Sequence, residues 1–184
     1  MTGAGKPVLR IGLPSLARLA RRENGTAAIE LALLAPLLVL LLLNLVDFSL
    51  MIWSYMEADY SAQMGVRAAY ATCAGVALPA MANCPGLNAA VATAIKGTSL
   101  GSRVTLDGGS PSEGYYCVSG TSLQQVGSYS APPNPFNCAA AGNPNATPGD
   151  YIAVTVAYDF TPIFPGLSLA SARTVTGSAL QRLQ

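Results

Sequence analysis

The chain has 184 residues, of which 51% are hydrophobic and only 10% are charged, and its net charge is +1. Ordinary soluble domains carry about 25% charged residues. Since much of the apolar excess lies in one segment, the composition excludes one large core and indicates a membrane-anchored protein with one modest domain. The sequence contains no histidine, which excludes the usual Ser-His and Cys-His nucleophiles. With no paired carboxylates on a common element either, we expect no enzyme, no catalytic residues and no cofactor.

The first segment is a basic leader. Residues 1–25 carry a net charge of +4, whereas residues 26–184 carry −3. Because Lys and Arg beside a span mark the cytoplasmic side, we expect a single-pass membrane protein with its N-terminus in the cytoplasm and its C-terminal domain outside. Topology explains these basic residues, so no nucleic-acid partner is predicted. Gly and Pro make residues 1–20 a mostly disordered leader, with a short helix expected over Ser15–Arg22.

A long apolar run follows the leader. Ten of the sixteen residues from Leu31 to Val46 are leucine, and only Asn44 among them is strongly polar. A bilayer core needs roughly 20 helical residues, a length reached by adding Thr26–Ile29 and the residues beyond Asp47. We interpret Asn44 and Asp47 as marking the non-cytoplasmic edge of the membrane span. The alternative is that they make polar contacts between packed subunit helices. Pro36 should kink the helix mildly.

The apolar pattern continues beyond the span at steps of three and four, as on an amphipathic helix. We therefore predict one helix of about 45 residues, from near Thr26 to near Ala71, whose second half carries a small domain. Trp53 and Tyr55 fall where an interfacial aromatic anchor would lie. The residues of the apolar stripe are Phe48, Met51, Ile52, Tyr55, Met56, Ala62, Val66, Ala69 and Tyr70. The charged residues expected on a solvated face are Glu57, Asp59 and Arg67.

The remaining chain predicts a small mixed domain. Leu87 to Ile95 is spaced for one short helix, with Gly97 as its stop, and Ser130–Asp150 reads as a long surface loop. The fold class is α+β: a leader at 1–25, a long helix at 26–72 with its first half in the membrane, and a disulfide-containing extracytoplasmic domain with an antiparallel sheet at 73–184. The predicted strands are 103–106, 114–118, 151–160 and 172–180, with a turn at 162–166 between the last two.

All four cysteines follow the span: Cys73, Cys84, Cys117 and Cys138. An even number of cysteines in an oxidising compartment indicates disulfides. Three pairings are possible, and we favour Cys73–Cys84 and Cys117–Cys138 because each closes a short loop that contains Pro and Gly. No metal site is predicted, since the chain has neither a CxxC pair nor a histidine.

The junction of leader and span carries the most specific signal. Cutting between Gly25 and Thr26 would make Glu30 the fifth residue of the mature chain. A free α-amino group is mostly protonated at neutral pH, and an isolated charge in lipid is costly. Glu30 of one subunit could therefore neutralise the Thr26 amine of a neighbour and fix the stagger of packed helices.

The sequence at 21–36, Arg-Arg-Glu-Asn-Gly-Thr-Ala-Ala-Ile-Glu-Leu-Ala-Leu-Leu-Ala-Pro, resembles the processing site and span opening of TadE-like pseudopilins. These are minor components of the tight-adherence (Flp, type IVb) pilus system. The resemblance implies a pilin-like fold and a place in the bacterial inner membrane, with the C-terminal domain periplasmic or extracellular. It further implies cleavage after Gly25 by a prepilin peptidase and N-methylation of Thr26. It also implies pilins, pseudopilins and the Tad assembly machinery as partners, beside the lipid bilayer.

Two functions of different classes follow. The first is a structural minor pseudopilin, matured at Gly25 and assembled through its first helix. The second is a permanently anchored periplasmic binding module that is neither processed nor polymerised, which predicts an uncut leader and tolerance of Glu30→Ala. An anchored enzyme would need catalytic groups that the sequence does not offer.

Overall fold

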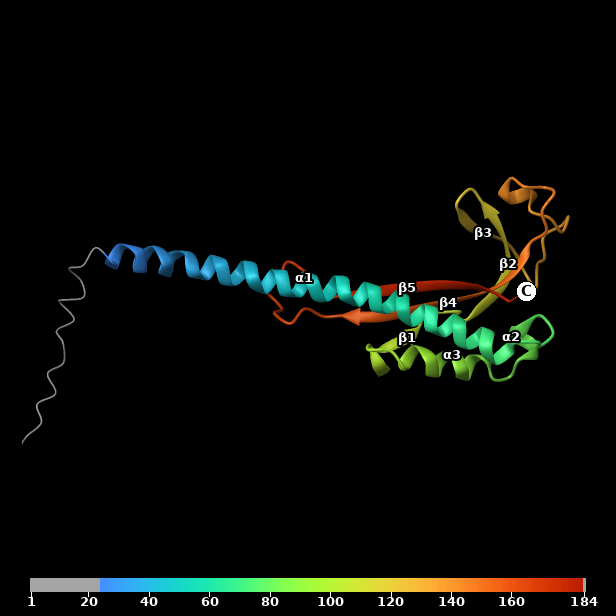
Figure 1. Cartoon of the computed structure of the whole chain (residues 1–184), viewed down its shortest axis with the longest axis horizontal. Helices are drawn as coiled ribbons and strands as arrows, with labels where there is room; N and C mark the ends of the chain where they lie inside the picture. The colour runs from blue at the N-terminus through green and yellow to red at the C-terminus, as the bar shows by residue number, and fades with distance from the viewer. Residues whose placement is uncertain (1–23, 184) are drawn as a thin grey trace, which may run out of the picture. The chain divides into compact units, whose positions relative to one another are not determined.

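The computed structural model describes residues 24–183, so the short helix expected over Ser15–Arg22 lies outside the described residues. It confirms the α+β class, with one long helix followed by a small antiparallel sheet domain (Figure 1). The helices are α1 (Asn24–Cys73), α2 (Ala80–Asn83) and α3 (Leu87–Lys96), with single 3-10 turns η2 (Gly101–Arg103) and η3 (Ala139–Ala141). The strands are β1 (Val104–Leu106), β2 (Ser112–Ser119), β3 (Ser122–Ser128), β4 (Gly149–Phe160) and β5 (Arg173–Arg182).

Helix α1 is 50 residues long and contains Pro36. Within the described residues it is the one helix long and apolar enough to cross a membrane. Two compact units divide after Leu43. The first unit, as far as it is described, is the N-terminal part of α1, where Leu33 and Leu37 are 75% and 65% exposed. Leucines that meet no protein partner need another apolar environment, and a bilayer would supply it.

The second unit begins at Asn44 and contains the sheet. Its central strand is β4, which pairs along one edge with β5 from Tyr151↔Arg182 to Phe160↔Arg173. The other edge of β4 pairs first with β2 and then with β1, and β3 pairs with β2; all pairs are antiparallel. In β4, Ile152, Val154 and Val156 are fully buried, which is the alternation that a half-buried strand requires.

The domain half of α1 packs through its small residues. Ala58, Ala62 and Ala69 are fully buried. A Cβ added at Gly177 of β5 would meet the Ala58 carbonyl group and lie 2.5 Å from the nitrogen of Asp59. Helix and strand therefore approach as closely as their backbones allow.

The predicted apolar stripe is right only in part. Ala62, Val66 and Ala69 are buried, but several large members of the stripe face outward. Those residues are Phe48, Ile52, Tyr55, Met56 and Tyr70. The physical reason is the close approach to β5, because a large side chain on the inner face would force the helix off the sheet.

Most other elements lie where they were predicted. Helix α3 buries Leu87, Val91 and Ile95, and a Cβ at Gly65 of α1 would lie 3.1 Å from the Ile95 side chain and 3.0 Å from that of Val154. One core therefore joins α1, α3 and β4. Strand β3 was not predicted.

Candidate functional site

The predicted processing segment forms the first turns of α1. Gly25 is half-buried, and Thr26 and Glu30 are exposed. Thr26 and Glu30 are four residues apart on a helix, so they share one face about one turn apart. Within residues 24–183 no ion pair of Glu30 is found, which leaves its carboxylate available to another molecule. The first N–H groups of a helix have no intrahelical partner, and helix ends fray.

A second polar cluster lies twenty residues further along α1. The Asn44 amide donates to the Leu167 carbonyl oxygen at 3.2 Å, and its oxygen accepts from the N–H of Leu169 at 2.6 Å. The fully buried Asp47 accepts from the N–H of Ile163 through Oδ1 at 2.9 Å. We define residues 161–172, which join β4 to β5, as the β4–β5 loop. The two residues interpreted from sequence as a membrane boundary thus hold this loop against the helix.

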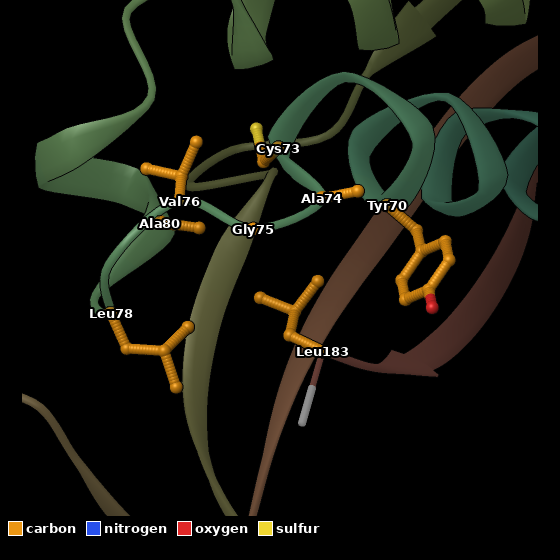
Figure 2. A pocket seen from close by; sticks show the side chains of 8 residues that line it. All are labelled: Tyr70, Cys73, Ala74, Gly75, Val76, Leu78, Ala80 and Leu183. Atoms are coloured by element: carbon orange, nitrogen blue, oxygen red, sulfur yellow. The ribbon is translucent and has the colours of Figure 1, made fainter.

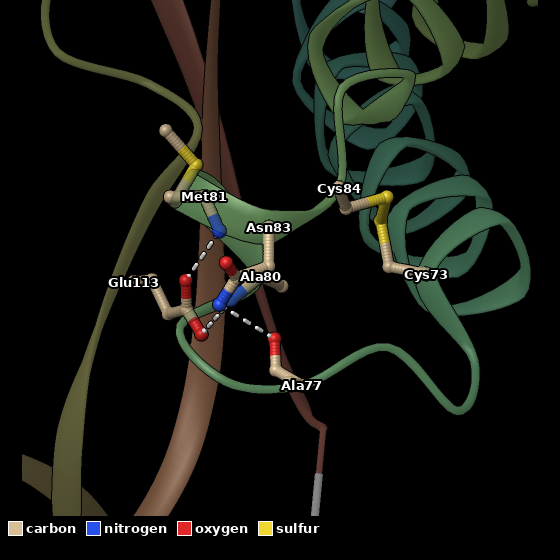
Figure 3. The surroundings of a disulfide bond; sticks show 7 residues. All are labelled: Cys73, Ala77, Ala80, Met81, Asn83, Cys84 and Glu113. Atoms are coloured by element: carbon tan, nitrogen blue, oxygen red, sulfur yellow. Dashed lines mark hydrogen bonds between the residues drawn. A yellow bond between two sulfur atoms is a disulfide. The ribbon is translucent and has the colours of Figure 1, made fainter.

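The C-terminal end of α1 is fastened by a disulfide (Figure 3). Cys73 and Cys84 are bonded with their Cα atoms 5.7 Å apart. Between them, the Glu113 carboxylate of β2 accepts from the N–H groups of Ala80 at 2.8 Å and Met81 at 2.7 Å. These contacts tie the helix end to the sheet. Glu113 was not singled out from sequence, and a lone glutamate in a strand gives no signal of this role.

A hollow beside this disulfide is lined by apolar side chains from the end of α1, the following turn and the chain's C-terminal end (Figure 2). Tyr70 at its rim is the one lining residue with a titratable side chain, since Cys73 is disulfide-bonded. The side chains that line this hollow therefore offer no pair of nucleophile and base.

The second disulfide lies at the far end of the sheet. Cys117 and Cys138 are bonded with their Cα atoms 5.6 Å apart, so both bonds have the pairing favoured from sequence. Nearby, the Tyr115 ring centroid lies 4.8 Å from that of Tyr129 and 5.0 Å from that of Phe136. Tyr115 is thus used for packing, as is Tyr116, whose ring lies 5.5 Å from Tyr151.

Asp150, at the start of β4, is a buried carboxyl group. It is 6% exposed, and neither of its oxygens accepts a hydrogen bond of ordinary geometry from the described residues. Burial raises its pKa to about 6; the neighbouring Tyr129 hydroxyl opposes this rise and the Glu113 carboxylate adds to it. Burial, followed by the influence of Asp150, also raises the pKa of Tyr129. No motif singles out Asp150 and Glu113 from sequence, because they lie on different strands 37 residues apart.

No group of three or more metal-ligating side chains occurs within residues 24–183. Of the helix residues expected on a solvated face, Asp59 and Arg67 are exposed. Glu57 is half-buried and accepts a hydrogen bond from the Ser99 hydroxyl, which connects α1 to the segment after α3.

A long helix with an apolar first half and a small antiparallel domain on its second half defines a pilin-like, membrane-anchorable protein. Residues 25–67 match the family model described as TadE-like protein, so this segment is TadE-like and the resemblance predicted from residues 21–36 is confirmed. The match covers 43 of the 184 residues, all of them in α1. No curated protein and no solved structure matches the chain.

Proposed function

We propose that this protein is a structural minor pseudopilin of a Tad (Flp) pilus or of its assembly complex. The observation that carries the proposal is the extent of the family match, which begins at Gly25 and ends at Arg67. The matched residues all belong to α1, so what this chain shares with its family is the helix. The sheet domain is then the part that this subunit carries outward.

Maturation by a prepilin peptidase would cut between Gly25 and Thr26. Several features support this: the glycine lies in the first turn of α1, and a Cβ there would meet nothing within 4 Å. The site is therefore sterically open to a protease. The basic residues before it favour a cytoplasmic position for the cut, with the sheet domain on the periplasmic or extracellular side.

Assembly would then use Glu30. The new Thr26 amine is cationic at neutral pH, and the exposed Glu30 carboxylate is the sole acid of α1 before Asp47. Opposite charges in an apolar medium attract strongly, whereas each alone is costly. A helix whose Thr26 amine meets Glu30 of its neighbour is thus favoured at one axial stagger.

Co-expression with a prepilin peptidase tests maturation. We expect intact-mass measurement to show a chain that begins at Thr26, and Gly25→Val to abolish the cut. The matched control is Ala28→Val, which enlarges an exposed position one turn later and should still be cut. If Met1 or Thr2 is the only N-terminus found, the maturation claim is contradicted. That result would favour the alternative function, a permanently anchored binding module that is not processed.

A second experiment tests the assembly contact. Glu30→Ala should leave membrane insertion intact but sharply reduce recovery of the protein in sheared pili or in the isolated assembly complex. Asp59→Ala, which removes another exposed acid of α1, is the control and should assemble normally. Unchanged piliation and attachment with Glu30→Ala would contradict this role of Glu30.

A further inference from the structure

The β4–β5 loop carries the most exposed large apolar side chain described in the chain. Leu169 is 82% exposed, more than any leucine of the N-terminal part of α1, and Ile163 and Leu167 are 57% and 56% exposed. No residue from 161 to 172 is charged. Exposing three neighbouring apolar side chains on a loop to water costs free energy. Such a loop is therefore a candidate contact site for an apolar partner.

At least five of the ten backbone N–H groups of this loop have a hydrogen-bond partner. Pro162 and Pro165 have no N–H. Asp47 and Asn44 accept from the N–H groups of Ile163 and Leu169. The remaining internal bonds run from the N–H groups of Leu167 and Ser168 to the Phe164 carbonyl oxygen, and from the N–H of Ala170 to the Ser168 hydroxyl. Such internal pairing is what a non-helical segment needs to enter an apolar environment.

The attachment of the loop also hides the polar groups of the helix. Asp47 is fully buried, and both polar atoms of the Asn44 side chain bond to the loop backbone. Around these two residues, Leu45, Val46 and Phe48 are exposed. Helix and loop together therefore present an apolar surface made of Leu45, Val46, Phe48, Ile163, Leu167 and Leu169.

The position of this surface along α1 identifies its partner. The 18 residue steps from Thr26 to Asn44 correspond to about 27 Å of helix, and the hydrocarbon core of a bilayer is about 30 Å thick. If the mature N-terminus lies at the cytoplasmic face, Asn44 and Asp47 lie at the outer face of the same membrane. The loop held by these residues would then lie at the lipid surface.

We propose that the β4–β5 loop is a second membrane contact, which inserts Ile163, Leu167 and Leu169 into the outer interface of the bilayer beside α1. The proposal rests on the anchoring part of the proposed function. Arg173 follows the loop at the start of β5 and is exposed, so its cation lies where lipid phosphates would be. A domain attached to the membrane at two points is restricted in tilt before it leaves the bilayer.

Depth-dependent fluorescence quenching tests this contact. The full-length chain, in a Trp53→Phe background, is reconstituted into vesicles of phosphatidylcholine and phosphatidylglycerol that contain lipids spin-labelled near the headgroup. Leu169→Trp should be quenched at least about twofold more than Val118→Trp, since an interfacial indole lies at headgroup level. Val118 is the matched control, because it is 61% exposed on β2 and far along the sheet from the loop.

A third variant, Leu38→Trp, reports whether the span itself is in lipid, using lipids labelled deep in the acyl chain. If Leu38→Trp is quenched and Leu169→Trp is not, the loop contact is overturned while the anchor stands. If neither is quenched, the anchoring in the proposed function fails together with the loop contact. If Leu169→Trp is shielded from aqueous iodide only at a high protein-to-lipid ratio, a second copy of the chain covers the loop and the lipid contact is again overturned.

Discussion

The two halves of α1 differ in where their large apolar side chains lie. Before Asn44 most leucines of the helix are exposed, with exposed fractions from 41% for Leu40 to 75% for Leu33. After Asn44 the buried face is mostly alanine, serine and glycine, joined by Val66, and several large apolar residues such as Ile52 and Met56 lie on the other side. The first pattern suits lipid, whereas the second suits close packing on a sheet.

The comparison teaches that hydrophobicity alone does not locate the inner face of such a helix. Burying a large side chain contributes more apolar area, but here the backbone of α1 meets the backbone of β5 at Ala58 and Gly177. Where two backbones touch, residue volume decides which side faces inward.

The strongest test of this contact is Gly177→Ala. The added Cβ would meet the Ala58 backbone, which cannot move without lifting α1 from β5. We expect the free energy of unfolding of the domain to fall by at least about 3 kcal/mol, measured by thermal unfolding of the detergent-solubilised chain. Gly108→Ala is the control, because its Cβ would meet nothing within 4 Å. Equal stability of the two variants would show that α1 is not seated this closely.

The second test concerns the C-terminal end of the packed half. Replacing Cys73 and Cys84 by alanine removes a bond between residues 11 apart in sequence. The expected loss is about 2–3 kcal/mol of unfolding free energy, and limited proteolysis should then cut first between Cys73 and Leu87. The first half of α1 has no such fastening, so its insertion into vesicles should be unchanged. Impaired insertion would instead show that membrane insertion of the first half depends on the folding of the second.

Much of the fold was predictable because its signals are local. The uninterrupted helical run, the alternation in β4 and the spacing of α3 each occupy one segment of sequence. Strand β3 was missed because Ser122–Ser128 is mostly polar and exposed, so it lacks the alternation that predicts a strand. Its place comes from pairing with β2.

In the candidate site, too, the residues with a local signal were predictable and those defined by long-range contacts were not. Gly25 and Glu30 stand out because their spacing is local, and the family match begins there. The partners of Asp47 and Asn44 were not predictable, since Ile163 lies 116 residues from Asp47 in sequence. Small residues at Ala58, Ala62 and Ala69 could have identified the inner face of α1 had volume been weighed beside hydrophobicity.

The third test concerns the pH dependence of the stability of the sheet domain, on which the second half of α1 packs. The pKa of Asp150 is raised to about 6 from 3.8, so the folded domain binds this proton more tightly than the unfolded chain does. The contribution of Asp150 to stability is therefore fully present below about pH 4 and is lost as the pH rises through about 6, by about 2 kcal/mol after discounting for solvent access. Asp150→Asn should flatten that slope in denaturant titrations, with Asp107→Asn as an exposed control. An unchanged slope would show that Asp150 does not cause the pH dependence.

The smallest expected effect lies at the boundary between the halves. Asp47→Ala removes the acceptor of the Ile163 N–H and should cost about 1–2 kcal/mol, because that donor is left without its partner. Asp47→Asn keeps an acceptor oxygen in the same place and should cost less, since Oδ2 of the wild-type carboxylate has no partner among the described residues. Hydrogen exchange at the Ile163 and Leu169 amides measures the effect directly. Faster exchange at both sites in Asp47→Ala would show that Asp47 and Asn44 act jointly in holding the loop. Faster exchange at Ile163 alone would show that each residue holds a separate part of the loop. In either case the loop, and not the sheet, responds to a change in α1 at the point where its side chains turn from leucine to alanine.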